Sequence, residues 1–298
     1  MSDRFKVLIP TDFSDCARNA LAHALYLTKR YDGEIHLLHA VELPTIAVTD
    51  MPPDMFDIEE ERALERMEDL LEEHAVHQAR TSRVHTAVRP GKPTEPAAEV
   101  ILDYAEDAEI DMIVMGTHGR RGARRLLLGS VAEQVIRGAE CPVFAVRETE
   151  KAWPLPSVDT ILVPVDFSAG TDDVINEAID LAGHYDAAIR LLHVVDIDTY
   201  PHYGIAVDPV IELAEKTAQA ARKELEKIAD RITVGHLAVF VSVERGHAAS
   251  TISEYAVDCD VDLIVLGSHG RSGLDRLLLG SVAEKTLRMA HCPVVVVR

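Results

Sequence analysis

Short apolar runs alternate with amphipathic stretches along the chain, and the same order of segments occurs twice. In the first half, five apolar runs have the length and β-branched content of buried strands; they cover residues 5–10, 35–41, 84–88, 111–115 and 142–146. Between these runs, apolar residues recur every three or four positions, which predicts helices at about 14–31, 58–77, 97–105 and from residue 130.

The second half repeats this order. Its apolar runs cover residues 161–164, 189–195, 239–243, 261–266 and 293–297, and a second acidic helix is predicted at about 211–229. Strands that alternate with helices favour a parallel sheet covered on both faces. We therefore predict an α/β, Rossmann-like chain with two tandem open sheets of five parallel strands. Its domains would be residues 1–148 and 158–298, joined by a linker at 149–157 that contains two prolines and the only tryptophan.

One glycine-containing stretch is repeated closely in the two halves. Residues 115–131 read MGTHGRRGARRLLLGSV, and residues 266–282 read LGSHGRSGLDRLLLGSV. Gly116 follows an apolar strand, and Gly119 lets the backbone approach another group because it has no Cβ. Ser130 is a natural N-cap, with Glu133 at capping-box spacing. A helix start offers unpaired N–H groups that suit an anion such as phosphate, although the glycines could also serve only to make turns.

Acidic and basic residues gather at the same predicted edge. In a parallel sheet, the loops after strands one, two and four converge beyond the carboxyl ends of the strands, where ligands bind. Asp12 and Asp166 follow the first strand of each repeat and could cap a helix, accept hydrogen bonds from a ribose or help hold Mg²⁺. Arg120 and Arg271 follow the second glycine and form either a solvated basic turn or a polyphosphate contact.

The overall charge argues against some classes of binding partner. The formal net charge is −20 over 298 residues, which argues against nucleic acid and anionic membrane surfaces as general partners. No apolar run approaches the length of a membrane span, and residues 1–14 have no signal-peptide core. The four cysteines include no CxxC pair, so we expect reduced thiols and a cytoplasmic protein.

Several common sites are excluded by spacing. The loop lacks the GxxxxGK[ST] pattern of a P-loop, and its GxxGxxG spacing differs from the dinucleotide fingerprint. His118 and His269 have no second metal ligand at matching spacing in both repeats. His36 and His39 resemble a pair, but the residue that corresponds to His36 in the second repeat is Arg190. We therefore expect no metal site made by the protein alone.

The two motifs together resemble those of a known family. The pattern G-x2-G-x9-G-S after an apolar strand, with P-[TV]-D-F-S after the first strand, is similar to the ATP-binding branch of the universal stress proteins. The resemblance covers both repeats and hence nearly the whole chain. It implies an adenine-nucleotide alpha-hydrolase-like fold in two domains related by a pseudo-two-fold. It also implies antiparallel pairing of the two fifth strands within the chain, which could extend to a homodimer.

The resemblance further implies where the ligand would lie. Adenine and ribose would contact the loops after strands one and two, and the phosphates would contact the glycine loop. With the loop histidines and arginines added, the first site would use Pro10, Thr11, Asp12, Ala40, Met115, Gly116, His118, Gly119, Arg120, Gly129, Ser130 and Val131. The second site would use Pro164, Val165, Asp166, Val194, Leu266, Gly267, His269, Gly270, Arg271, Gly280, Ser281 and Val282. Ala40 and Val165 depart from the usual valine and threonine, which predicts unequal affinities.

Three functions follow as alternatives. The first is a cytoplasmic regulatory protein of stress physiology that binds ATP, ADP or AMP, with Mg²⁺ where Asp12 and Asp166 help to hold it. Such a protein would have no catalytic residue and at most a weak ATPase activity. The second is a true ATPase or adenylyl-transfer enzyme, and the third is an interaction scaffold without nucleotide. Protein partners are not identified by the sequence.

Overall fold

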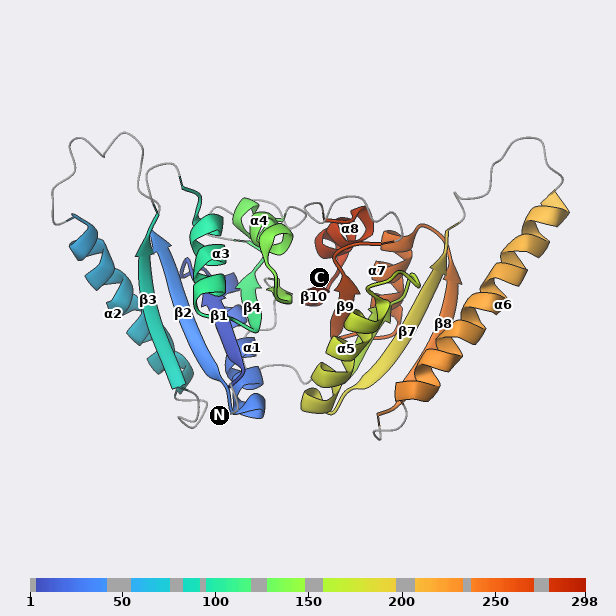
Figure 1. Cartoon of the computed structure of the whole chain (residues 1–298), viewed down its shortest axis with the longest axis horizontal. Helices are drawn as coiled ribbons and strands as arrows, with labels where there is room; N and C mark the ends of the chain where they lie inside the picture. The colour runs from blue at the N-terminus through green and yellow to red at the C-terminus, as the bar shows by residue number, and fades with distance from the viewer. Residues whose placement is uncertain are drawn as a thin grey trace. The chain divides into compact units, whose positions relative to one another are not determined.

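The chain divides into two compact units, Met1–Pro156 and Ser157–Arg298. A computed structural model describes residues 4–41, 55–75, 83–91, 95–118, 128–147, 158–196, 207–232, 237–270 and 279–298. The expected linker at 149–157 lies outside these residues, and the expected pairing of the two fifth strands stays a prediction. Each unit is an α/β layer structure of its own (Figure 1).

The first unit contains a sheet of five parallel strands in the order β3-β2-β1-β4-β5. Apolar runs form the inner strands because these are buried in the sheet interior; Val7, Leu8 and Ile9, for example, have no exposed surface, whereas the edge strand β3 is mostly exposed. The strands are β1 (Lys6–Pro10), β2 (Glu34–Val41), β3 (Arg83–Pro90), β4 (Met112–Gly116) and β5 (Val143–Val146). The parallel five-stranded sheet predicted from the sequence is confirmed.

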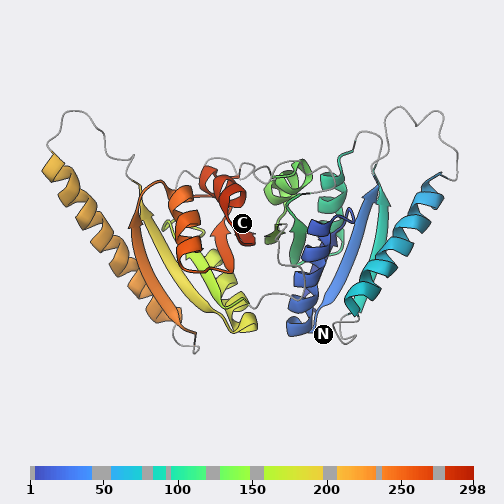
Figure 2. The same ribbon diagram turned by 180° about the vertical axis from the view of Figure 1, so that it is seen from behind.

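Four helices connect these strands. Helices α3 and α4 pack on each other on one face of the sheet, and α1 lies on the opposite face (Figures 1 and 2). The amphipathic stretches thus bury their apolar side against the strands. The helices are α1 (Asp15–Tyr31), α2 (Met55–Ala75), α3 (Ala97–Asp107) and α4 (Ser130–Gly138).

The turn between α1 and β2 shows why glycine stands at position 33. Asp32 ends α1 in the left-handed region, with φ of 49°. The N–H of Gly33 then donates to the carbonyl of Thr28 at 2.8 Å. A Cβ on Gly33 would lie 2.5 Å from the carbonyl oxygen of Phe5, so only glycine lets the chain pass this close.

The second unit repeats the first, with five parallel strands in the order β10-β9-β6-β7-β8. Its strands are β6 (Thr160–Pro164), β7 (Ala188–Val195), β8 (Val239–Arg245), β9 (Leu263–Gly267) and β10 (Val294–Val297). Its helices are α5 (Thr171–Tyr185), α6 (Val207–Ile232), α7 (Ala248–Asp258) and α8 (Ser281–Met289). Among the described helices of either unit, none combines the length and apolar character that a membrane span requires.

Candidate functional site

The loop after β1 is held by a set of local hydrogen bonds. The N–H of Phe13 donates to Thr11 Oγ1 at 3.0 Å, and the N–H of Ser14 donates to Asp12 Oδ1 at 3.0 Å. Ser14 is the N-cap of α1, and its hydroxyl accepts the N–H of Ala17 at 3.3 Å. Asp12 therefore does not cap α1, and its carboxylate is fixed at the carboxyl edge of the sheet.

The same loop in the second unit has the same strained conformation. Asp166 Oδ1 accepts the N–H of Ser168 at 2.9 Å. Phe13 and Phe167 have φ of 65° and 61°, in the left-handed region that residues with a Cβ rarely adopt. Strained backbone that recurs at corresponding positions often marks a functional loop. The two P-[TV]-D-F-S segments thus adopt equivalent conformations in the two units.

A histidine from the second strand supports each of these loops. His39 Nδ1 lies 2.7 Å from the carbonyl oxygen of Thr11, and His193 Nδ1 lies 2.7 Å from that of Val165. A carbonyl only accepts, so the proton is on Nδ1 in both rings. The rings also pack on Phe13 and Phe167, at centroid distances of 4.8 and 4.7 Å.

No motif identified from the sequence includes this histidine pair. The sequence pairs His39 only with His36, as possible metal ligands, and points to no role for His193. A repeated triplet in the sequence does indicate the two histidines, because Leu-Leu-His occupies residues 37–39 and 191–193. The histidine positions the backbone of the loop, which is a role that no ligand-binding motif describes.

The strand β4 ends close to α1, and the helix α4 begins close to the end of β4. A Cβ on Gly116 would lie 3.0 Å from three atoms of Cys16, and a Cβ on Gly129 would lie 3.0 Å from the carbonyl oxygen of Thr117. The N–H of Gly129 donates to that oxygen at 2.8 Å. Glycine is therefore required for the close approach of the strand end to the helix start.

The second unit has the same connection between β9 and α8. The N–H of Gly280 donates to the carbonyl of Ser268 at 2.7 Å, and a Cβ on Gly280 would lie 3.1 Å from the same oxygen. Both glycine motifs therefore tie the start of a helix to the end of a strand. The two helix starts lie at the carboxyl edge of each sheet, where ligands bind in open α/β folds.

The predicted capping box is wrong. Gly129 and Gly280 are the N-caps, with φ and ψ of −64° and 145° at Gly129, and neither helix start has a side-chain cap. Ser130 is the first residue of α4, and its side chain is exposed. The carboxylate of Glu133 pairs with Arg137 at 2.7 Å, one turn further along the helix. The N–H groups of the first turn thus have no side-chain cap, which is the arrangement that binds anions.

One further contact links two loops at this edge, and the histidine of each glycine loop makes a contact within its own loop. A Cβ on Gly270 would lie 3.0 Å from Asp166 Oδ2, so the glycine loop and the loop after β6 lie against each other. His269 Nδ1 lies 2.8 Å from Ser268 Oγ, and His118 Nδ1 lies 3.0 Å from Thr117 Oγ1. Nε2 is buried in both histidines and has no hydrogen-bond partner in the described part of the chain. A buried polar atom without a partner is the kind of group that a bound ligand satisfies.

The remaining predicted residues fall into two groups. Met115 and Leu266 are buried strand residues with 4% of their surface exposed, so only their backbone atoms could reach a ligand. Pro10 and Pro164 end β1 and β6, Ala40 and Val194 lie near the ends of β2 and β7, Gly267 ends β9, and Val131 and Val282 lie in the first helical turn. The structure does not describe Gly119, Arg120 and Arg271, so their predicted roles stay predictions.

Phe13 and His39 also line a hollow beside α2. Ala63, Arg62 and Arg66 of α2 form its other wall. The guanidinium of Arg66 lies 3.8 Å from the centroid of the Phe13 ring, which is close enough for a cation–π contact. This contact connects α2 to the strained loop after β1.

Comparisons with known proteins agree with these features. The model of the universal stress protein family matches residues 4–147 and 157–298. A universal stress protein of Methanocaldococcus jannaschii is 36% identical over 152 residues, which cover 49% of this chain and 84% of that protein. The universal stress protein Rv2623 of Mycobacterium tuberculosis is 27% identical over 299 residues, which cover 98% of this chain and 96% of that protein.

Solved structures show the same fold. The crystal structure of a universal stress protein from Archaeoglobus fulgidus has a TM-score of 0.69 at 23% identity and covers 98% of both chains. That of a putative universal stress protein from Pseudomonas aeruginosa has a TM-score of 0.68 at 18% identity and covers 99% of this chain and 93% of that chain. Since the family model matches twice and accounts for nearly the whole sequence, this chain belongs to the universal stress protein family, with two such domains in tandem.

Proposed function

We propose that the chain binds adenine nucleotides, with ATP as the expected ligand, and acts as a regulatory protein with slow or no hydrolysis. The observation that carries this proposal is the pair of helix starts at Gly129 and Gly280. Their first-turn N–H groups have no side-chain cap and suit the oxygens of a phosphate chain. Because the arrangement occurs in both units, we propose two sites per chain.

Asp12 and Asp166 suit the ribose or the metal that accompanies the phosphates. Each carboxylate is fixed by a main-chain N–H two residues later, and Asp166 Oδ2 lies against the glycine loop at Gly270. A carboxylate held in this way could accept a ribose hydroxyl or contribute to Mg²⁺ binding, and Mg²⁺ supplies charge neutralisation to the phosphates. Ala40 and Val194 would offer apolar contact to the adenine.

Slow turnover follows from the groups that surround the proposed phosphate site. Hydrolysis requires a base that can activate water. Nε2 of His118 and of His269 is buried, so these rings are better placed to bind a ligand than to activate bulk water. Asp12 and Asp166 each accept a main-chain N–H, which holds the carboxylate in place as a ligand for ribose or metal.

The test measures bound nucleotide and its effect on stability. We would purify the full chain without added nucleotide, denature it and identify any released nucleotide by mass spectrometry. The melting temperature would also be followed against Mg-ATP. At a hundredfold excess over Kd, each occupied site should add about 2.7 kcal/mol, or roughly 5 to 10 °C. The variant Gly129→Val with Gly280→Val should lose this shift, because each new side chain meets a carbonyl oxygen near 3 Å.

A matched control is available at another helix start. Gly170 is the N-cap of α5, and a Cβ there would meet nothing within 4 Å, so Gly170→Val should keep the shift. Absence of nucleotide and of any shift would contradict the proposal and favour a scaffold without nucleotide. Steady-state phosphate release of several per second, abolished by Asp12→Ala, would favour a true ATPase.

We also propose a cytoplasmic location. Supporting it are the four cysteines, none of which forms a disulfide in the described part of the chain, and the strongly acidic composition. Fractionation of cells that express the tagged full chain would test it, and recovery from an oxidising compartment with disulfides formed would contradict it.

A further inference from the structure

Three side chains with metal-binding atoms lie together at the opposite end of the first sheet. Glu34 and His36 belong to β2 and His85 belongs to β3, at the amino ends of both strands. The parallel register places His36 directly beside His85. Alternation along each strand turns Glu34, His36 and His85 to the same face of the sheet. This cluster is remote from the loops at the carboxyl edge, so it does not belong to the proposed nucleotide site.

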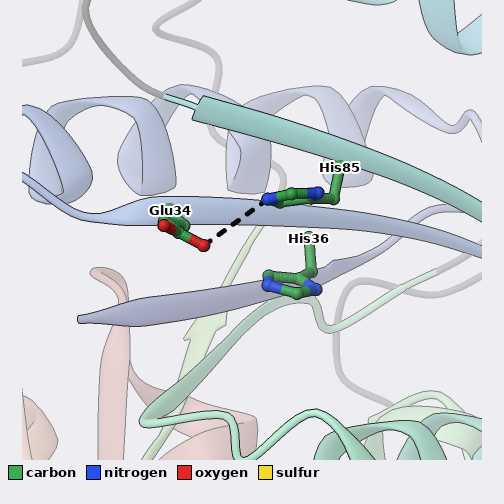
Figure 3. Close-up of side chains that lie close together, drawn as sticks. All are labelled: Glu34, His36 and His85. Atoms are coloured by element: carbon green, nitrogen blue, oxygen red, sulfur yellow. Dashed lines mark ion pairs between the residues drawn. The ribbon is translucent and has the colours of Figure 1, made fainter. Parts of the chain in front are cut away.

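The side chains already have a geometry close to coordination. His85 Nε2 lies 3.4 Å from Glu34 Oε2, and one ligand atom from each of the three residues lies within 4.8 Å of the others. The two rings have centroids 5.0 Å apart at an angle of 30°, and both turn a nitrogen toward Glu34 (Figure 3). Tetrahedral zinc with bonds of about 2.1 Å separates its ligand atoms by about 3.4 Å. Small side-chain rotations would therefore complete the arrangement.

A hydrogen bond at Nδ1 orients the ring of His36. Its Nδ1 lies 2.9 Å from the hydroxyl of Tyr104, while its Nε2 is buried and has no hydrogen-bond partner among the residues that the structure describes. A proton on Nδ1 donated to Tyr104 leaves the Nε2 lone pair available, as in most histidine ligands.

Nearby cations do not prevent metal binding. Arg4 and Arg83 each approach Glu34 Oε1 at 3.8 Å, but these arginine side chains are 38% and 65% exposed, so the pairs are weak. Lys6 Nζ donates to the carbonyl of Ala108 at 2.9 Å and does not pair with Glu34. The oxygen of Glu34 that faces His85 is Oε2, so a metal could bind there without breaking a buried ion pair.

The second unit provides an internal comparison. Register and repeat alignment place Ala188, Arg190 and Phe240 where the first unit has Glu34, His36 and His85. There the guanidinium of Arg190 stacks over the Phe240 ring at 5.0 Å from its centroid. The second unit therefore forms the same sheet without a histidine–carboxylate cluster, so the sheet does not require the cluster of the first unit.

We propose that Glu34, His36 and His85 bind a divalent transition metal, with Zn²⁺ as the expected ion. Two imidazole nitrogens and one carboxylate oxygen form a donor set that suits zinc and leaves a fourth position for water. Tyr104 is the positioning residue, because it orients the His36 ring through Nδ1.

The test uses the full chain freed of metal and nucleotide by chelation and dialysis. Calorimetric titration with Zn²⁺ should show one ion per chain, and Co²⁺ should give the visible absorption of a four- or five-coordinate site. The swap His36→Arg with His85→Phe copies the second unit, so it should fold while weakening Zn²⁺ binding at least 100-fold. Glu34→Gln keeps the shape of the side chain and should weaken binding at least tenfold. Tyr104→Phe should weaken it about tenfold.

His184→Gln is the matched control. His184 Nε2 lies 3.6 Å from Asp180 Oδ1 on α5, which is a histidine–carboxylate pair in a part of the chain where the structure identifies no three-residue cluster. Its substitution should leave Zn²⁺ affinity and the Co²⁺ spectrum unchanged. Zn²⁺ binding that survives the swap variant, or wild-type chain that binds no Zn²⁺ at millimolar concentration, would overturn the proposal. Far-UV circular dichroism of each variant separates loss of the site from loss of the fold.

Discussion

Two ionisable side chains at corresponding positions of the repeat should give the chain opposing responses to pH. His23 of α1 aligns with Glu177 of α5, since Ser14 and Tyr31 align with Ser168 and Tyr185. His23 is 7% exposed and packs on Phe144, and burial lowers its pKa to about 4. Burial, with a smaller contribution from Asp180, raises the pKa of Glu177 to about 7.

The signs of the two effects are opposite. For His23, the folded pKa of about 4 lies below the unfolded 6.5, so stability falls as pH drops from 6.5 to 4. For Glu177, the folded pKa of about 7 lies above 4.5, so stability falls as pH rises from 4.5 to 7. The full effect is about 3 kcal/mol for His23 and about 2 kcal/mol for Glu177, which is only partly buried.

The difference in stability between each variant and wild type should isolate the pH slope that the substituted residue contributes. We would measure the free energy of unfolding by urea titration at half-unit steps from pH 4.5 to 8, using the transition of the unit that carries the substitution. The free energy of unfolding of His23→Leu should rise relative to that of wild type by about 1.4 kcal/mol for each unit by which the pH falls below 6.5. The free energy of unfolding of Glu177→Gln should rise relative to that of wild type as the pH increases from 4.5 to 7. Difference curves that stay flat over these ranges would refute the burial argument, whatever their constant offset.

Four other substitutions test local features. Ser14→Ala should lower the free energy of unfolding, measured with urea, by about 1 kcal/mol because α1 loses its N-cap. Ser168→Ala should change this free energy by less than about 0.5 kcal/mol, since the N-cap of α5 is a glycine. Gly33→Ala should cost about 1 to 3 kcal/mol because its Cβ would meet a carbonyl oxygen at 2.5 Å; an unchanged melting temperature would contradict this. His39→Leu should weaken nucleotide binding about five- to tenfold, because the carbonyl of the loop after β1 loses its donor, and unchanged affinity by calorimetry would remove His39 from the proposed site.

The fold followed from the sequence because its signals are local and repeated. Residues 7–9 are apolar, bounded by a charged residue and a proline, and fully buried in a parallel strand as this pattern predicts. Helix α4 begins at Ser130, as expected, but its N-cap is Gly129 and not the predicted Ser130. Ser130 and Glu133 have capping-box spacing, but the extended conformation of Gly129 places the cap one residue earlier. Sequence spacing alone does not distinguish these two caps.

Contacts between distant residues could not be predicted in this way. His36 and His85 become neighbours only through the register of β2 and β3, and the sequence does not give that register. The contact between Gly270 and Asp166 likewise depends on how two loops fold over one edge of a sheet. The cluster of Glu34, His36 and His85 occurs in one half only, so a requirement that metal ligands recur at the same spacing in both halves excludes it.

The glycine N-caps of α4 and α8 have a consequence for genetics and for evolution. Every amino acid except proline carries a main-chain N–H, so no deletion of a side chain can remove the donors at these helix starts. An alanine scan of the first helical turn would therefore miss an anion site there, and neutral drift of its side chains would leave the donors in place. Loss of such a site requires steric obstruction or a shift of the backbone, which makes Gly129 and Gly280 the positions at which inactivating variants should concentrate.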